Sequence, residues 1–296
     1  MTGRWQAAAV LYFGVFCVST SAVFVRLALG AAETAGVGFS LVIAASRLIL
    51  ASLILLPTWR HFQPSRYQPG AAAYSAIAGV LLALHFATWI TSLSYTSIAA
   101  STVLVTTNPI WVALVSWLWL KERLPRRTVV GIAVTIVGGV LVGWQGGGAV
   151  GQNPLLGNGL ALVGAWTFSL YFLLGRAAQR RGLKLGQHSA IAYTVAAVTL
   201  LPLPWAFEAS YGGYPPSVYG YIGLMALVPQ LLGHTSLNWA ATRMSPTLVT
   251  LVILMEPVGA SLLGYLAFGE VPGVRVLMGA IVILAGVTLA AAEAYA

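Results

Sequence analysis

The second half of this 296-residue chain repeats residues of the first half at a constant offset of 148. Four pairs keep this spacing without a gap: Pro109 and Pro257, Glu122 and Glu270, Gly131 and Gly279, and Gly138 and Gly286. A weaker match at an offset of 150 pairs Gly14 with Gly164 and Arg26 with Arg176. Because 148 is half of 296, the repeat predicts two related halves, residues 1–148 and residues 149–296.

The composition of the chain is that of a membrane protein rather than a soluble one. Apolar residues make up 59 % of the chain and charged residues 7 %, against about 25 % charged residues in soluble domains. The chain contains no Asp, and its single cysteine, Cys17, has no partner for a disulfide within the chain. We therefore predict a polytopic membrane protein. Its net charge of +9 does not indicate a nucleic-acid partner, because the basic residues cluster at predicted helix ends on one side.

Ten apolar stretches are long enough to be membrane spans, since a helix needs about 20 apolar residues to cross a hydrocarbon core of roughly 30 Å. The predicted spans are residues 5–29, 37–59, 70–94, 97–119, 126–145, 154–177, 187–207, 217–240, 245–268 and 272–293. A glycine-rich segment at 146–151 is the predicted linker between the halves. Five spans per half is an odd number, so the two copies must face opposite ways across the bilayer. We therefore expect an all-α protein of ten transmembrane helices in two inverted five-helix repeats, an arrangement typical of secondary transporters.

The orientation follows from the lysine and arginine residues near the span ends, which favour the cytoplasm. With a cytoplasmic N-terminus, twelve of the fifteen fall on the cytoplasmic side. Arg26 and Arg275 lie on the opposite side, and Arg47 falls inside the second span. We therefore predict that both termini are cytoplasmic.

Several short motifs recur in a fixed order across both halves. They are Arg47-Leu48 at the second span, Ala99-Ala100-Ser101 ahead of Asn108-Pro109, Lys121-Glu122-Arg123-Leu124 after the fourth span, and Met255-Glu256-Pro257 followed by Gly269-Glu270. In these motifs the chain resembles the drug/metabolite transporter superfamily in its ten-helix EamA-like branch. Its aromatic content is similar to that of the YddG-type aromatic amino-acid exporters.

The resemblance implies a basket of ten helices around a central cavity in a bacterial inner membrane. It also implies export of aromatic and other neutral amino acids. The second half lacks the lysine and arginine residues that flank Glu122, so a role of that basic cluster does not extend to Glu270.

Polar residues within a bilayer are costly, so each buried one is a candidate for a functional site. Glu256 falls in the middle of the ninth span, and its counterpart Asn108 in the middle of the fourth. Glu256 could carry a proton or contact the amino group of a substrate. Alternatively, it could be a neutral, hydrogen-bonded residue that supports the backbone around Pro257, because burial favours the protonated form of a carboxylic acid.

Pro109 and Pro257 follow these two residues. A proline inside a helix removes one amide donor and displaces the carbonyl group four residues earlier. We expect free carbonyl groups at Val105 and Ile253, and interpret the prolines either as moving hinges or as fixed kinks that shape a cavity.

Two pairs of polar side chains are spaced four residues apart and so share a helix face: His85 with Trp89, and Gln230 with His234. We expect them to line a substrate cavity, although they could instead make helix–helix hydrogen bonds of about 0.6 kcal/mol each. Trp166 lies at the centre of the sixth span, where it would either pack between helices or form an aromatic platform for a substrate.

A secondary transporter of small amphipathic metabolites is the function that these features favour. No phosphate-binding GxxxxGK[ST] motif, HExxH or GxSxG is present, and we expect neither a cofactor nor a metal. An intramembrane enzyme would need a nucleophile with a base, or metal ligands. A carrier of nucleotide sugars or lipid-like compounds shares the predicted fold, but Arg47 is the only basic residue deep in a span to pair with phosphates.

Overall fold

The computed structural model of the chain describes residues 2–63, 67–120, 126–143, 153–241, 243, 249 and 252–292. The predicted basic loop from Lys121 to Pro125, including Glu122, and the predicted linker at 146–151 lie outside these residues. The described part of the chain is helical and contains no β-strand, which confirms the all-α prediction.

Each of the ten predicted ranges contains at least one described helical segment. The described elements are α1 (Thr2–Ser19), α2 (Ser21–Ala31), α3 (Val37–Ile54), the 3-10 turn η1 (Leu56–His61), α4 (Ala71–Ser92), α5 (Ile98–Val105), α6 (Asn108–Leu120), α7 (Arg126–Gly143), α8 (Pro154–Arg180), α9 (Leu185–Leu200), α10 (Leu203–Ala206), α11 (Pro216–Met225), the π-helix η3 (Ala226–His234), α12 (Thr235–Ala241), α14 (Glu256–Phe268) and α15 (Val274–Ala292).

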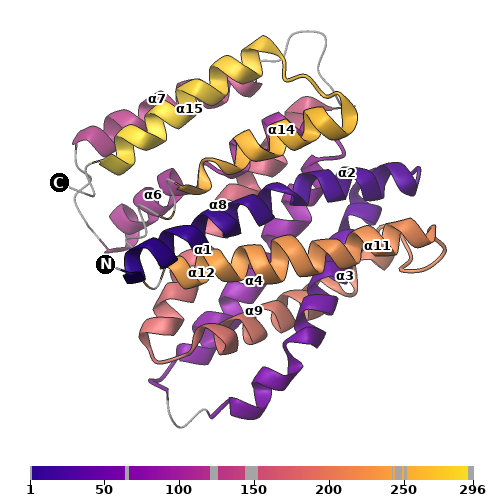
Figure 1. Ribbon diagram of the computed structural model, residues 1–296, viewed down its shortest axis with the longest axis vertical. Coiled ribbons are helices and arrows are strands. Elements are labelled where there is room, and N and C mark those ends of the chain that lie inside the picture. The colour runs from indigo at the N-terminus through magenta and orange to yellow at the C-terminus, as the bar shows by residue number, and fades with distance from the viewer. Residues whose placement is uncertain are drawn as a thin grey trace.

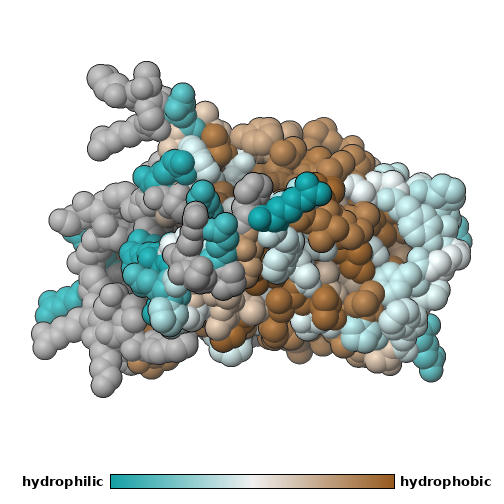
Figure 2. Space-filling model, turned by 90° about the horizontal axis from the view of Figure 1, so that it is seen from below, coloured by the Kyte–Doolittle hydropathy of each residue, from teal (hydrophilic) through white to brown (hydrophobic). Residues whose placement is uncertain are grey.

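Five helical stretches in the described residues are long and apolar enough to cross a membrane, and three more are apolar but shorter. The five are Gln6–Ala31, Val37–Ile54, Ala71–Ser92, Pro154–Arg180 and Leu185–Ala206. Apolar side chains form a band across the middle of the visible face, with more polar side chains on either side of it (Figure 2). Such a band indicates a lipid environment, because soluble proteins rarely expose large contiguous apolar patches.

The helices run roughly along one direction and form two groups (Figure 1). α7 and α15 lie side by side at one edge, and they pack most extensively on each other. In the larger group, α4 packs against α8 and α9, while α1 and α2 pack against η3, α12 and α11. α1 begins and α15 ends at the same end of the bundle (Figure 1).

Several of the helices are interrupted near their middle. α1 and α2 are separated at Thr20, α5 and α6 at Thr106 and Thr107, and a turn at Leu254 and Met255 precedes α14. The π-helix η3 interrupts the stretch between α11 and α12 and contains Pro229. Short π-helical segments inside α-helices are frequent at functional sites.

These interruptions correct the predicted position of the two prolines. Pro109 and Pro257 are not inside continuous helices, because each is the second residue of a new helix, α6 or α14. An amide in the first helical turn has no acceptor within its helix, so proline costs little there. The backbone is therefore broken before each proline rather than kinked by it.

Candidate functional site

A small cavity lies at the centre of the bundle, among the interrupted helices. Its volume is about 30 Å³, and it is lined by residues next to three of the breaks, such as Ser21, Thr106 and Glu256. Since a water molecule needs at least about 10–15 Å³, this space holds roughly two water molecules. The helices are therefore closed around the site in this structure.

Five of the residues predicted to bind substrate line this cavity. They are His85, Trp89, Asn108, His234 and Glu256. They come from four separate parts of the chain, α4, α6, η3 and α14. The structure brings these five side chains together around one cavity.

The orientation of His85 is fixed by one hydrogen bond. Its Nδ1 lies 2.9 Å from the carbonyl oxygen of Gly164 on α8. A carbonyl group can only accept, so Nδ1 carries the hydrogen, and a neutral ring leaves Nε2 as an acceptor. The ring also stacks on Trp89, with centroids 6.0 Å apart and an interplanar angle of 4°. α4 and α8 approach closely at this level, since a Cβ atom added to Gly164 would lie 3.3 Å from Cβ of Trp89.

Asn108 bridges the break between α5 and α6. The Asn108 carboxamide is oriented so that its nitrogen faces two acceptors. This nitrogen donates to the carbonyl oxygens of Val105 at 2.8 Å and Ala165 at 3.1 Å. The Val105 carbonyl group, which we expected to be free, is thus paired. Ser169 donates to the backbone carbonyl oxygen of Asn108 at 3.2 Å, so α8 holds the start of α6 from two positions. These bonds give Asn108 a structural role besides lining the cavity.

Glu256 occupies the equivalent position in the second half, as the first residue of α14. Its backbone carbonyl oxygen accepts from Ser19 Oγ at 3.3 Å, which links α14 to α1. Glu256 thus combines an acidic group in the cavity with a helix break.

Both interpretations of Trp166, as a side chain packed between helices and as an aromatic platform in the cavity, are wrong. Its side chain is 47 % exposed on the outer surface of the bundle. The inner face of α8 is formed by Ala161, Ala165 and Phe168, which recur at helical spacing and are buried. Phe168, two residues further on, therefore supplies the aromatic side chain that lines the cavity.

Gln230 also lies elsewhere than predicted. It is fully buried, but it is not part of the cavity lining, whereas His234 is. Both residues belong to the π-helix η3, whose wider turn changes the angle between side chains four residues apart. The Gln230 side chain contacts Arg47 instead, through a hydrogen bond of 3.0 Å from Arg47 Nη2 to Gln230 Oε1.

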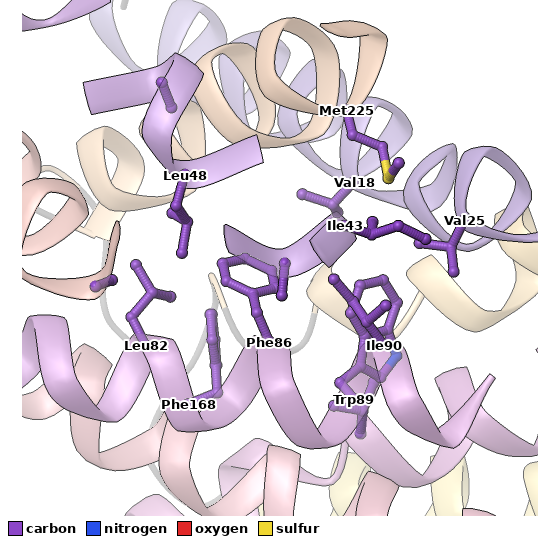
Figure 3. Packing of buried hydrophobic residues seen from close by; sticks show 14 of the residues in the cluster. Val18, Val25, Ile43, Leu48, Leu82, Phe86, Trp89, Ile90, Phe168 and Met225 are labelled. Atoms are coloured by element: carbon purple, nitrogen blue, oxygen red, sulfur yellow. The ribbon is translucent and has the colours of Figure 1, made fainter. Parts of the chain in front are cut away.

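Arg47 is the main residue that sequence reasoning left out of the site. Its side chain is completely buried, and Nη1 donates to Ser21 Oγ at 3.1 Å. Its guanidinium carbon lies 4.1 Å from the ring centroid of Phe86, a cation–π contact. Phe86, Trp89 and Phe168 belong to the same buried cluster (Figure 3). The depth of Arg47 in the second span was the available signal, since buried intramembrane charges mark functional sites.

A larger cavity of about 400 Å³ lies beyond Phe172, and we call it the arginine vestibule. Its charged lining consists of Arg176 and Arg180, from the last turns of α8, and Arg243, from a turn after α12. Stacking of Phe168 on Phe172, with centroids 6.3 Å apart, connects the lining of the central cavity with that of the vestibule. The vestibule has the volume of a small-molecule site, and the central cavity does not.

The opposite end of the bundle is tied by a cluster of polar contacts, which we call the Arg26–Glu270 latch. Arg26 Nη1 lies 3.8 Å from a carboxylate oxygen of Glu270, and its Nη2 donates to the carbonyl oxygen of Thr96. The other Glu270 oxygen accepts from the backbone amide of Ile98 at 2.7 Å. These contacts join α2, the start of α5 and the loop after α14.

Proteins named as transporters or exporters resemble this chain in sequence. An uncharacterized transporter of Archaeoglobus fulgidus is 23 % identical over 256 residues, which cover 83 % of this chain and 86 % of that protein. A probable terminal-alkyne amino-acid exporter of Streptantibioticus cattleyicolor is 27 % identical, over 64 % of this chain and 62 % of that protein. The pseudopaline exporter CntI of Pseudomonas aeruginosa is 25 % identical, over 70 % of this chain and 71 % of that protein.

The fold also has a counterpart among solved structures. One crystal structure of a protein matches with a TM-score of 0.62 and 18 % identity, over 98 % of both chains. The sequence profile of the EamA-like transporter family matches twice, at residues 5–144 and 155–292, and so covers most of the chain. The chain therefore belongs to the EamA-like transporter family.

Proposed function

We propose that the chain is a secondary transporter that exports small amphipathic metabolites by alternating access, with aromatic and other neutral amino acids as the favoured substrates. The observation that carries this proposal is the position of the central cavity. It lies between the arginine vestibule and the end tied by the Arg26–Glu270 latch. A closed central site, with a larger cavity on one side and the latch on the other, fits one state of a transporter.

The proposed movement uses the interrupted helices. α6 and α14 begin beside the cavity with Asn108-Pro109 and Glu256-Pro257, so each can tilt about the break that precedes it. Many transporters place the substrate at such discontinuous helices. In this proposal the prolines mark the hinges, and the closely packed pair of α7 and α15 is a static support.

We propose that residues 1–148 and 149–296 form inverted five-helix repeats, with both termini on the cytoplasmic side of a bacterial inner membrane. The helix packing supports this arrangement. An offset of about 148 residues relates α4 to the stretch from α11 to α12, and α8 to α1 and α2. α4 packs on α8, and the related stretch packs on α1 and α2. Two copies of one unit would produce such equivalent contacts.

The chemistry of the cavity supports an amino-acid substrate. Trp89, Phe168 and His85 offer ring faces for an aromatic side chain, and Glu256 offers an acceptor for an ammonium group. The similarity to a probable terminal-alkyne amino-acid exporter favours the same class. The alternative is a carrier of another metabolite, such as a nucleotide sugar or a lipid-like compound. The similarity to a pseudopaline exporter keeps the general alternative of another metabolite open. An intramembrane enzyme is less well supported, because the named relatives are transporters or exporters.

The test is uptake of labelled amino acids into proteoliposomes that contain the purified protein, with and without a pH gradient. We expect uptake of phenylalanine or a related neutral amino acid above that of empty liposomes. Absence of uptake and of exchange for the whole amino-acid panel would reject the proposed substrate class. Faster uptake with a pH gradient would indicate proton coupling, whereas indifference to the gradient would indicate facilitated diffusion.

A further inference from the structure

Arg47 is a buried cation whose contacts in the described part of the chain are all with neutral groups. Its guanidinium group contacts Ser21, Gln230 and the ring of Phe86. No carboxylate among the described residues lies within 4.0 Å of it, and Glu256 interacts with it only at longer range. A buried charge without a close counter-ion is costly, so its retention calls for a compensating partner.

The surroundings of Arg47 hold more hydrogen-bond donors than acceptors. Among the described residues, Nε of Arg47 and Nε2 of Gln230 are buried without an acceptor. Ser21 Oγ accepts the hydrogen of Arg47 Nη1, and its own hydroxyl hydrogen is then free for another acceptor. Buried polar groups normally have partners, so three donors without acceptors indicate a missing acceptor group.

Ser21 connects this set of donors with the central cavity. It is the first residue of α2, next to the break at Thr20, and it lines the cavity beside Glu256. A ligand in the widened cavity therefore reaches the Ser21 hydroxyl first, with the charge of Arg47 behind it. A hydroxyl that is bonded to a guanidinium group favours an anionic acceptor over a neutral one.

We propose that Ser21, positioned by Arg47 and Gln230, binds the carboxylate group of the transported compound. This proposal rests on the proposed function and narrows its substrate class to compounds that carry a carboxylate. Glu256 lines the same cavity and supplies an acceptor for an ammonium group. An α-amino acid carries both groups, so it satisfies the donors around Ser21 and the acceptor at Glu256 together.

Three compounds with one aromatic body test the proposal: L-phenylalanine, 2-phenylethylamine without the carboxylate, and 3-phenylpropionate without the ammonium group. Binding to the purified full-length protein in lipid nanodiscs is measured by isothermal titration calorimetry. We expect Ser21→Ala to weaken binding of both carboxylates about tenfold, the value of one hydrogen bond to a charged group. Binding of 2-phenylethylamine should change less than twofold. Ser21→Thr retains the hydroxyl group and should restore most of the affinity.

Ser52→Ala is the matched control. Ser52 lies on α3 five residues after Arg47, and its hydroxyl donates to the carbonyl oxygen of Ile49 at 2.8 Å within the same helix. Its replacement should leave the binding of all three compounds unchanged. Arg47→Gln should reduce carboxylate binding at least as much as Ser21→Ala. If Arg47→Gln does not fold, the comparison of Ser21→Ala with Ser21→Thr still tests whether the Ser21 hydroxyl binds the carboxylate.

The outcomes separate this proposal from the proposed function. Binding of 3-phenylpropionate but not phenylalanine, with the Ser21→Ala loss, supports the carboxylate site and rejects amino acids as substrates. Binding of the amine alone overturns the carboxylate site. Equal effects of Ser21→Ala on all three compounds, or no effect, also overturn it. A wild-type protein that binds none of the three contradicts both proposals.

Discussion

Removal of the Glu270 carboxylate should open the end of the bundle that the Arg26–Glu270 latch ties. Glu270 accepts a hydrogen bond of 2.7 Å from the backbone amide of Ile98 and lies 3.8 Å from Arg26 Nη1. The three residues belong to three segments: Arg26 to α2, Ile98 to α5 and Glu270 to the loop after α14. If transport separates these segments, the contacts stabilise only the state in which this end is closed.

The size of the effect follows from the burial of the two side chains. The Glu270 side chain is 8 % exposed, so its bond to Ile98 has the value of a charged hydrogen bond, about 1.5–3 kcal/mol. The Arg26 side chain is 21 % exposed, so the ion pair adds less than about 1 kcal/mol. Glu270→Ala should therefore favour the open state by about 2 kcal/mol, or roughly 30-fold. Glu270→Gln keeps an acceptor for Ile98 and should favour the open state by only about 1 kcal/mol, or roughly fivefold.

A cysteine in the central cavity reports this equilibrium. Val105→Cys, in a Cys17→Ala background, is labelled with a membrane-impermeant maleimide added on the side of Glu270. The labelling rate should rise about 30-fold with Glu270→Ala and fivefold with Glu270→Gln. Glu33→Gln is the control, because Glu33 is exposed near the end of α2 and its replacement removes the same charge. Equal rates in the Glu270 and Glu33 variants would refute the latch.

Three further predictions follow from packing and from the cavity lining. Gly138→Ala should be less stable to chemical unfolding than Gly139→Ala by about 1–3 kcal/mol. A Cβ atom at Gly138 would lie 2.7 Å from Ile283 Cγ1, whereas one at Gly139 has nothing within 4 Å, and both variants gain the same helix propensity. Phe168→Ala should change the substrate affinity in proteoliposomes at least tenfold, and Trp166→Ala less than twofold, because only Phe168 lines the cavity. Glu256→Gln should abolish any dependence of uptake on a pH gradient while sparing exchange of labelled substrate, and retained dependence would exclude Glu256 as the proton carrier.

Much of the helical framework could be predicted from the sequence, because it depends on local composition. Long apolar runs fix where helices form, and each of the ten predicted ranges holds a helical segment. The helix breaks were harder to place. Pro109 was expected to kink a continuous helix, but the chain ends α5 at Val105 and starts again at Asn108. Pro229 lies within the π-helix η3. A proline within a span indicates an irregular helix, but we did not use this signal.

The site was only partly predictable, because its contacts join residues far apart in the chain. His85 and Trp89 were found through their spacing on one helix. Trp166 was misplaced, because its depth in the span does not show which side of α8 faces inward. The bonds of Arg47 to Ser21 and Gln230 depend on how three segments pack together, which one sequence does not specify.

Substrate protection of a cavity cysteine during transport tests most directly whether the central cavity is the transport path. Val105→Cys lines the cavity in a Cys17→Ala background, and Trp166→Cys on the outer surface is its control. Proteoliposomes are treated with a small methanethiosulfonate reagent, and uptake of labelled phenylalanine is then measured. We predict that the reagent abolishes uptake by the Val105→Cys protein, that excess unlabelled phenylalanine slows this loss, and that the Trp166→Cys protein keeps its uptake. Full uptake by the Val105→Cys protein after complete modification would contradict the assignment of this cavity as the path.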